Sequence, residues 1–153
     1  MGDSGSTSDL KLGVNGFGRI GKLTVWHHVA RKYFKEIVVN IGREAGTSLE
    51  DIAHYVQRDS TYGRLHTYLY GQNGKPAVEA VDEKTGTMML DGTRVTFLRS
   101  HRNPVNIGWR GQGVNLVVET TGQFLDPTLG PDHGSGTLRG HLDAGAAKVI
   151  ASA

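Results

Sequence analysis

The fold of this chain is decided by residues 10–33, which read LKLGVNGFGRIGKLTVWHHVARKY. A short apolar run leads into a G-x-G-x-x-G pattern at Gly16, Gly18 and Gly21, and a helical pattern follows at once. Strand, glycine turn and helix in this order are what a dinucleotide-binding turn needs. Gly16 suits a tight turn, Gly18 lets backbone approach a pyrophosphate, and Gly21 allows the helix to pack on the strand. An ordinary glycine-rich connection is the alternative.

The composition indicates one globular domain and excludes several other classes. The chain has 153 residues, of which 37% are hydrophobic and 21% charged, and this is enough for a core. Its formal net charge of +2 is too small to indicate a nucleic-acid or membrane partner. It has no cysteine, which excludes disulfides, thiolate metal sites and a thiol nucleophile within these residues. Residues 1–9 are small and polar, so we expect a disordered tail before a cytoplasmic domain over residues 10–153.

The elements expected around the glycine turn form one βαβ unit. Residues 10–14 suit a strand, residues 19–33 have a helical pattern, and residues 37–41 suit a buried parallel strand because they are rich in β-branched side chains. The apolar stripe expected to face the core is Ile20, Leu23, Trp26 (or His27) and Ala30.

The middle of the chain is expected to form a capped helix and then an antiparallel meander. Thr47 or Ser48 can cap a helix that runs to about Gln57. Short strand candidates follow at residues 67–70, 77–81, 87–90 and 94–98. Asp91-Gly92 is a two-residue hairpin signal between the last two of these strands.

The last part of the chain returns to parallel-sheet character. Residues 114–119 suit a buried strand, residues 125–136 a loop, residues 137–144 a helix closed by Gly145, and residues 148–153 a further strand. Because the chain stops on a core strand, we expect a truncated chain or one piece of a split protein. The whole pattern predicts an α/β, Rossmann-like doubly wound fold, with a mostly parallel sheet, an antiparallel meander insertion and an incomplete C-terminus.

Five segments, in order and at similar spacing, resemble the amino-terminal part of the glyceraldehyde-3-phosphate dehydrogenase family. They are residues 14–21 (VNGFGRIG), 58–64 (RDSTYGR), 102–109 (RNPVNIGW), 117–124 (VVETTGQF) and 141–153 (HLDAGAAKVIASA). The resemblance implies the NAD- or NADP-binding portion of a phosphorylating aldehyde dehydrogenase of glycolysis or gluconeogenesis. The family's catalytic cysteine, catalytic histidine and substrate domain would lie beyond residue 153, so the chain alone is expected to be inactive. The full protein is expected to be a homotetramer.

The resemblance also implies a coenzyme site. Its candidate residues are Asn15, Gly16, Phe17, Gly18, Arg19, Ile20, Gly21, Arg43, Arg102, Thr120, Thr121, Gly122 and Ser152. Backbone N–H groups of residues 17–20 are expected at the pyrophosphate and adenosine side, Arg102 beside the adenine, and Ser152 near the nicotinamide. Residues 120–122 form a turn at the end of a parallel strand, where ligands of open α/β sheets collect. Plain strand-end hydroxyls are the alternative for the threonines and the serine.

The preference between NAD and NADP depends on the end of the second strand. A dinucleotide fold usually places an acidic residue there to hold the adenosine ribose. The family reads Ile-Asn-Asp at this point, where the chain reads Ile41-Gly42-Arg43. Arg43 can attract a 2′-phosphate and so favour NADP or relax the preference. Alternatively, Arg43 is a solvated loop residue and Glu44 takes the acidic role.

Two other functions remain open at this point. The chain can be a stand-alone, non-catalytic nucleotide-binding module, or part of a related sugar-phosphate dehydrogenase such as erythrose-4-phosphate dehydrogenase. No catalytic residue and no metal site are expected within the chain. The adjacent pair His27 and His28 does not share a helix face, and the other histidines lack ligand spacing.

Overall fold

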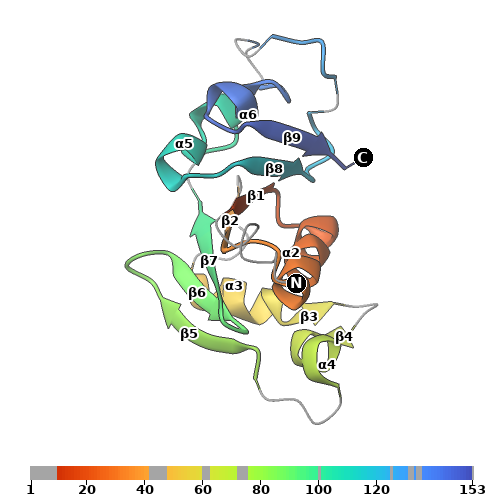
Figure 1. The fold of residues 1–153 in the computed structure, drawn as a ribbon, viewed down its shortest axis with the longest axis vertical. Helices are drawn as coiled ribbons and strands as arrows, with labels where there is room; N and C mark the ends of the chain where they lie inside the picture. Colours follow the sequence, from red (N-terminus) through yellow and green to blue (C-terminus); the bar gives the residue numbers. More distant parts are fainter. Residues whose placement is uncertain are drawn as a thin grey trace, which may run out of the picture.

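A seven-stranded, mostly parallel sheet forms the centre of the molecule (Figure 1). The computed structural model describes residues 10–41, 48–59, 63–71, 76–99, 101–124, 126–130, 133 and 136–152. The strands are β1 (Lys11–Asn15), β2 (Glu36–Asn40), β5 (Val78–Asp82), β6 (Thr87–Leu90), β7 (Thr93–Leu98), β8 (Leu116–Glu119) and β9 (Lys148–Ala151). Their order is β5-β6-β7-β2-β1-β8-β9, with β2 on one side of β1 and β8 on the other. Beyond β2 the chain crosses to the edge strand β5 and returns through β6 to β7, which pairs with β2. The expected doubly wound fold is confirmed, and its switch point lies between β1 and β8.

Helices cover both faces of the parallel strands. Alternate residues of β2 divide between two apolar clusters: Ile37 and Val39 belong to one, and Val38 to the other. The first cluster includes side chains of α2 (Arg19–Arg31) and α3 (Leu49–Val56), and the second lies under the short helices near β8 and β9. This coverage explains why β2 reads as a continuous apolar run rather than an alternating one.

The stripe that α2 buries overlaps the expected one only in part: Trp26 is buried as expected, and Leu23 is partly buried against the core. Ile20 is 52% exposed and Ala30 is also exposed, whereas Val25, Trp26 and Val29 are fully buried. Trp26 fixes the rotation of the helix, because its indole Nε1 donates to the carbonyl of Val56 in α3 at 2.6 Å. Trp26 is common to both possible stripes, and the stripe that adds Val25 and Val29 prevails over the one that adds Ile20 and Ala30.

The segment after α3 contains the clearest error of prediction. Ser48 caps α3 as expected, since its hydroxyl accepts from the N–H of Asp51 at 3.1 Å. Residues 67–70, however, lie in a helix, α4 (Leu65–Tyr70), and not in a strand. The fully buried Leu65 anchors this helix, and its N–H donates to the carbonyl of Gln57. Tertiary contacts therefore override the strand preference of the Thr and Tyr side chains.

The antiparallel meander is confirmed, and it extends one edge of the sheet. Strands β5, β6 and β7 pair antiparallel in succession, while β7 also pairs parallel with β2. Asp91 and Gly92 join β6 to β7 with φ angles of +48° and +81°. Two successive positive φ angles are those of the predicted two-residue hairpin turn. The sequence did not reveal a small separate ladder, β3 (Arg58–Asp59) with β4 (Gly63–Arg64).

Helices α5 (Trp109–Gln112) and α6 (Gly140–Asp143) lie beside β8 and β9 (Figure 1), and the short helix η1 (Pro104–Asn106) packs against α6. Helix α6 lies within the expected helix of residues 137–144, which is thus confirmed in shortened form. Gly145 closes it with φ of +118°, and a Cβ there would lie 2.6 Å from that of Arg110. Helix α5 was not expected. Among the described residues, no helix is long and apolar enough to cross a membrane.

Candidate functional site

The glycine turn between β1 and α2 contains two glycines that the protein's own packing requires and one that it does not. Gly16 has φ of +98°, and a Cβ on Gly21 would lie 2.1 Å from the carbonyl oxygen of Gly16. Gly18 has an ordinary φ of −77°, and a Cβ on it would meet nothing within 4 Å. The space beside Gly18 is therefore open, at the point where a dinucleotide fold brings its backbone close to the pyrophosphate.

The start of α2 is suited to an anion. Within the described part of the chain, no side chain caps this helix at Gly18, and its first turn contains no acidic residue. The first N–H groups of the helix point outward along its axis with a partial positive charge. A phosphate group placed beside Gly18 meets these conditions.

Two cations of α2 are held by a buried carboxylate next to the turn. The side chain of Asp59 is 2% exposed, and its Oδ1 lies 3.5 Å from Arg19 Nε and 3.9 Å from Lys22 Nζ. The ammonium of Lys22 also donates to the carbonyl of Arg58 and lies 4.1 Å from the ring centre of Tyr55. Burial lowers the pKa of Lys22, against the opposing effect of Asp59. This contact ties the first turn of α2 to β3.

The glycine turn forms one wall of the candidate site, and the turn after β8 forms the second wall. The hydroxyl of Thr120 lies 2.9 Å from the carbonyl oxygen of Asn15 and 3.1 Å from that of Gly16, so it bridges directly to the glycine turn. Thr121 donates both its N–H, at 2.8 Å, and its hydroxyl, at 2.5 Å, to Glu119 Oε2. Gly122 follows with φ of +74°. The threonine hydroxyls thus bind the chain itself and fix the shape of the turn.

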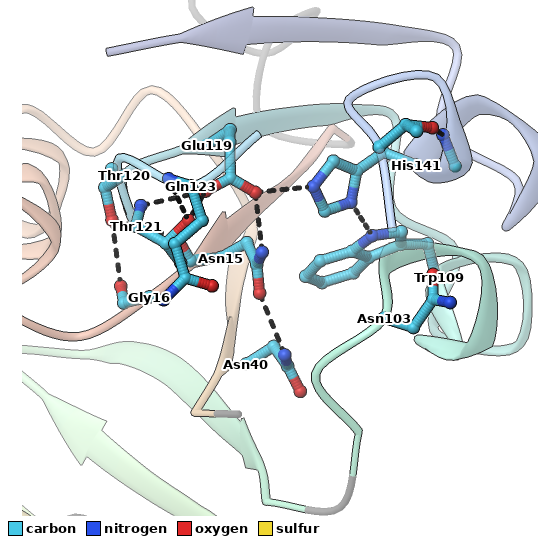
Figure 2. A network of polar contacts seen from close by, with 12 residues as sticks. Asn15, Gly16, Asn40, Asn103, Trp109, Glu119, Thr120, Thr121, Gln123 and His141 are labelled. Carbon is cyan, nitrogen blue, oxygen red and sulfur yellow. Dashed lines mark hydrogen bonds and ion pairs between the residues drawn. The ribbon is translucent and has the colours of Figure 1, made fainter. Parts of the chain in front are cut away.

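A buried polar network lies behind both walls (Figure 2). Glu119 is fully buried at the end of β8, and its Oε1 lies 2.6 Å from Asn15 Nδ2 and 2.8 Å from His141 Nε2. Asn15 in turn accepts from Asn40 Nδ2 at 2.8 Å. At the far end, Trp109 Nε1 donates to His141 Nδ1 at 2.9 Å. The network connects the ends of β2, β1 and β8 to α6 and α5.

The hydrogen bonds of this network keep Glu119 ionised. Burial raises the pKa of the Glu119 carboxyl, but hydrogen bonds from His141, Asn15 and Thr121 together hold that pKa below its ordinary value of 4.5. A carboxylate that accepts several donors is stabilised in its charged form. Trp109 can only donate, so His141 accepts at Nδ1 and donates from Nε2 to Glu119.

The lowered pKa of Glu119 predicts a stability contribution that depends on pH. A carboxyl whose pKa is lower in the folded state stabilises the protein above its unfolded pKa, and this contribution is lost as pH falls through the folded pKa. The difference in unfolding free energy between the protein and its Glu119→Gln variant should therefore be largest at neutral pH and shrink below about pH 4.5. Urea unfolding at a series of pH values measures it; a difference independent of pH contradicts the expectation.

The structure brings most, but not all, of the candidate residues together. Residues 15–21 and 120–122 meet at the ends of β1 and β8, and Ser152 joins them because its N–H donates to the carbonyl of Glu119 at 2.9 Å. The ring of Phe17 is buried between Tyr55 and Phe97, so only its backbone is available to a ligand. Arg102 is exposed in the segment between β7 and η1. Arg43 lies outside the described residues.

Four members of the network were missed by sequence reasoning. Asn40 and Glu119 each end an apolar strand, and a polar residue in that position is a signal that could have identified them. His141 and Trp109 carry no such signal, because their contact joins two short helices 32 residues apart in sequence. Within the described ranges, no group of three or more His, Asp or Glu side chains could hold a metal ion.

Comparison with known proteins gives a consistent result. The family model for the glyceraldehyde 3-phosphate dehydrogenase NAD binding domain matches residues 10–127. The chain is 32% identical to glyceraldehyde-3-phosphate dehydrogenase of Shimwellia blattae over 141 residues, which are 92% of this chain and 35% of the relative. It is 34% identical to the cytosolic enzyme of Taxus baccata over 149 residues, covering 97% and 37% respectively. The chain thus spans about a third of the length of the curated relatives it matches.

Proposed function

This chain belongs to the family of the glyceraldehyde 3-phosphate dehydrogenase NAD binding domain, and from that premise we propose that it binds a nicotinamide dinucleotide across the ends of β1 and β8. The observation that carries the proposal is the open space beside Gly18 at the uncapped start of α2. The pyrophosphate lies against the backbone of residues 17–20, between the glycine turn and the turn of residues 120–122. Arg102 lies beside the adenine and Ser152 near the nicotinamide.

The same proposal gives the chain its place in a larger enzyme. It is the coenzyme-binding portion of a phosphorylating aldehyde dehydrogenase, in which the nicotinamide accepts a hydride from the substrate. These 153 residues contain no cysteine, so the thiolate that attacks the aldehyde must come from sequence outside them. The chain alone is expected to show no turnover of glyceraldehyde 3-phosphate. The complete protein is proposed to be a cytoplasmic homotetramer.

The end of β2 bears on the choice between NAD and NADP. The residue that follows β2 is Ile41, which is 4% exposed, packs in the core and donates its N–H to the carbonyl of Leu98. An apolar side chain there cannot hold the ribose hydroxyls as an acidic residue does. Selectivity is therefore assigned to the following residues, where we propose that Arg43 donates hydrogen bonds to the 2′-phosphate of NADP.

Calorimetric titration with NAD+ and with NADP+ tests both the binding of a coenzyme and the role of Arg43. We expect Arg43→Asp to weaken NADP+ binding about tenfold, because an attractive charge becomes a repulsive one. Arg31→Asp makes the same change of charge at the exposed far end of α2, about 20 Å along the helix from Gly18, and should alter neither affinity by more than about twofold. Unchanged NADP+ affinity in Arg43→Asp contradicts the role of Arg43. A folded protein that binds neither coenzyme contradicts the proposed function.

A further inference from the structure

Four hydrogen-bond donors converge on one fully buried carboxylate behind the proposed dinucleotide site (Figure 2). Oε1 of Glu119 accepts from Asn15 in β1 and from His141 in α6, and Oε2 accepts twice from Thr121 in the turn after β8. The two oxygens therefore face different parts of the structure. One oxygen holds the strand that leads into the glycine turn, and the other holds the opposite wall.

Because donors reach both Oε1 and Oε2, the side chain at position 119 needs an acceptor oxygen on each of its two sides. The N–H and the hydroxyl of Thr121 both donate to Oε2, and that hydroxyl also accepts from the N–H of Gln123 at 3.2 Å. On the other side, Asn15 must turn its amide nitrogen to Oε1 so that its oxygen can accept from Asn40. A glutamine at position 119 has the same shape but only one oxygen, so its amide nitrogen would face donors on one side.

The hydrogen bonds of Glu119 also fix backbone groups at the surface of the candidate site. Thr121 is exposed, yet its N–H points inward to Glu119, and Gly122 next to it takes a left-handed conformation with φ of +74°. The neighbouring Thr120 hydroxyl contacts the carbonyl of Gly16 at 3.1 Å. The position of the turn relative to Gly16 thus depends on a carboxylate that itself has no exposed surface.

We propose that Glu119 is a positioning residue of the dinucleotide site, which sets the turn of residues 120–122 against the glycine turn, and that His141 acts through it. The proposal rests on the proposed function, because it assigns Glu119 a role in coenzyme affinity. His141 holds the carboxylate from behind and is itself fixed by Trp109 at 2.9 Å. Loss of Glu119's second acceptor releases Thr121 and widens the range of positions that the turn can take.

A double-mutant cycle on coenzyme affinity tests this role. We expect Glu119→Gln and Thr121→Ala each to raise the dissociation constant of the preferred coenzyme about tenfold. The dissociation constant of the double variant should not exceed that of the single variant with the lower affinity, because both changes remove the same contact. Thr121→Ser restores the hydroxyl and should recover the affinity lost in Thr121→Ala. Losses that multiply in the double variant, or wild-type affinity in Glu119→Gln, overturn the proposal.

The chain offers a matched control for the threonine change. Thr128 donates its N–H and its hydroxyl to Asp126 Oδ1, at 2.8 Å and 2.6 Å, in the same two-residue arrangement but on the exposed surface. Thr128→Ala should leave coenzyme affinity within about twofold. An equal loss in Thr128→Ala and Thr121→Ala shows a general effect of the substitution and overturns the proposal.

The design separates this inference from the proposed function. A folded wild-type protein that binds neither NAD+ nor NADP+ refutes the function, and with it the role of Glu119. A wild type that binds, with Glu119→Gln unaffected, refutes only the positioning role. Where Glu119→Gln does not fold, Glu119→Asp replaces it in the cycle, since it keeps the charge but is one methylene too short to reach both sides.

Discussion

Gly21→Ala is expected to lower the free energy of unfolding by about 3 kcal/mol and to abolish coenzyme binding. The added Cβ would lie 2.1 Å from the carbonyl oxygen of Gly16 and 3.0 Å from its carbonyl carbon, and both atoms belong to the backbone of the glycine turn. Backbone cannot yield as a flexible side chain can, so α2 must shift away from β1. Urea unfolding measures the stability, and calorimetric titration with NAD+ and NADP+ measures the binding.

Gly18→Ala is the matched variant in the same turn. Its Cβ would meet no atom of the protein within 4 Å, so the loss of stability should not exceed about 1 kcal/mol, the usual cost of alanine at a helix N-cap. Coenzyme affinity should nevertheless fall at least about tenfold, because the methyl group occupies the space assigned to the pyrophosphate. A Gly21→Ala protein as stable as wild type, or a Gly18→Ala protein with wild-type affinity, would contradict this division of roles.

His141→Leu is expected to lower the free energy of unfolding by about 3 kcal/mol. The substitution keeps an apolar side chain in a fully buried position but removes the donor to Glu119 and the acceptor for Trp109. A buried carboxylate and a buried indole N–H each lose a partner, and neither can reach water. Thermal and urea unfolding both measure this loss.

His141→Gln provides the control for this variant. Its amide can donate to Glu119 or accept from Trp109, so it should lose less stability than His141→Leu. Equal losses in the two variants would show that the shape of the ring, rather than its hydrogen bonds, stabilises the junction between β8 and α6.

The features that were predictable from sequence depend on local chemistry. The tight glycine turn, the Ser48 cap and the Asp91-Gly92 hairpin each need particular residues at adjacent positions, and all three are present in the structure. The buried parallel strands were also predictable, because continuous β-branched runs such as residues 37–41 suit little else. These features were sufficient to predict the doubly wound fold class, whereas the order of the strands comes from the structure.

The errors arise where distant contacts decide between local alternatives. Residues 67–70 have a strand-like composition, but Leu65 is buried in the main core and the segment folds as α4. The buried face of α2 depends on Trp26, whose indole finds the carbonyl of Val56 thirty residues away in sequence. No pattern confined to α2 contains that information.

The same distinction applies to the candidate site. The glycines and the turn of residues 120–122 follow from motifs, and the structure places them side by side. The groups behind them do not follow from motifs, because Asn15 and Glu119 are 104 residues apart and meet only through the pairing of β1 with β8. The motifs therefore identified two turns that the structure places together, and the structure was needed to identify the buried carboxylate behind them.

The most direct test of the account is a titration of ¹⁵N-labelled protein with NAD+ and NADP+, followed through the backbone amide signals. The account predicts the largest shifts for the amide signals of Gly16, Gly18 and Ile20, and a clear shift for that of Gly122. The amide signal of Arg31, at the far end of α2, should not shift. If neither coenzyme shifts the amide signals of the glycine turn in folded protein, the assignment of this turn as a dinucleotide site is wrong.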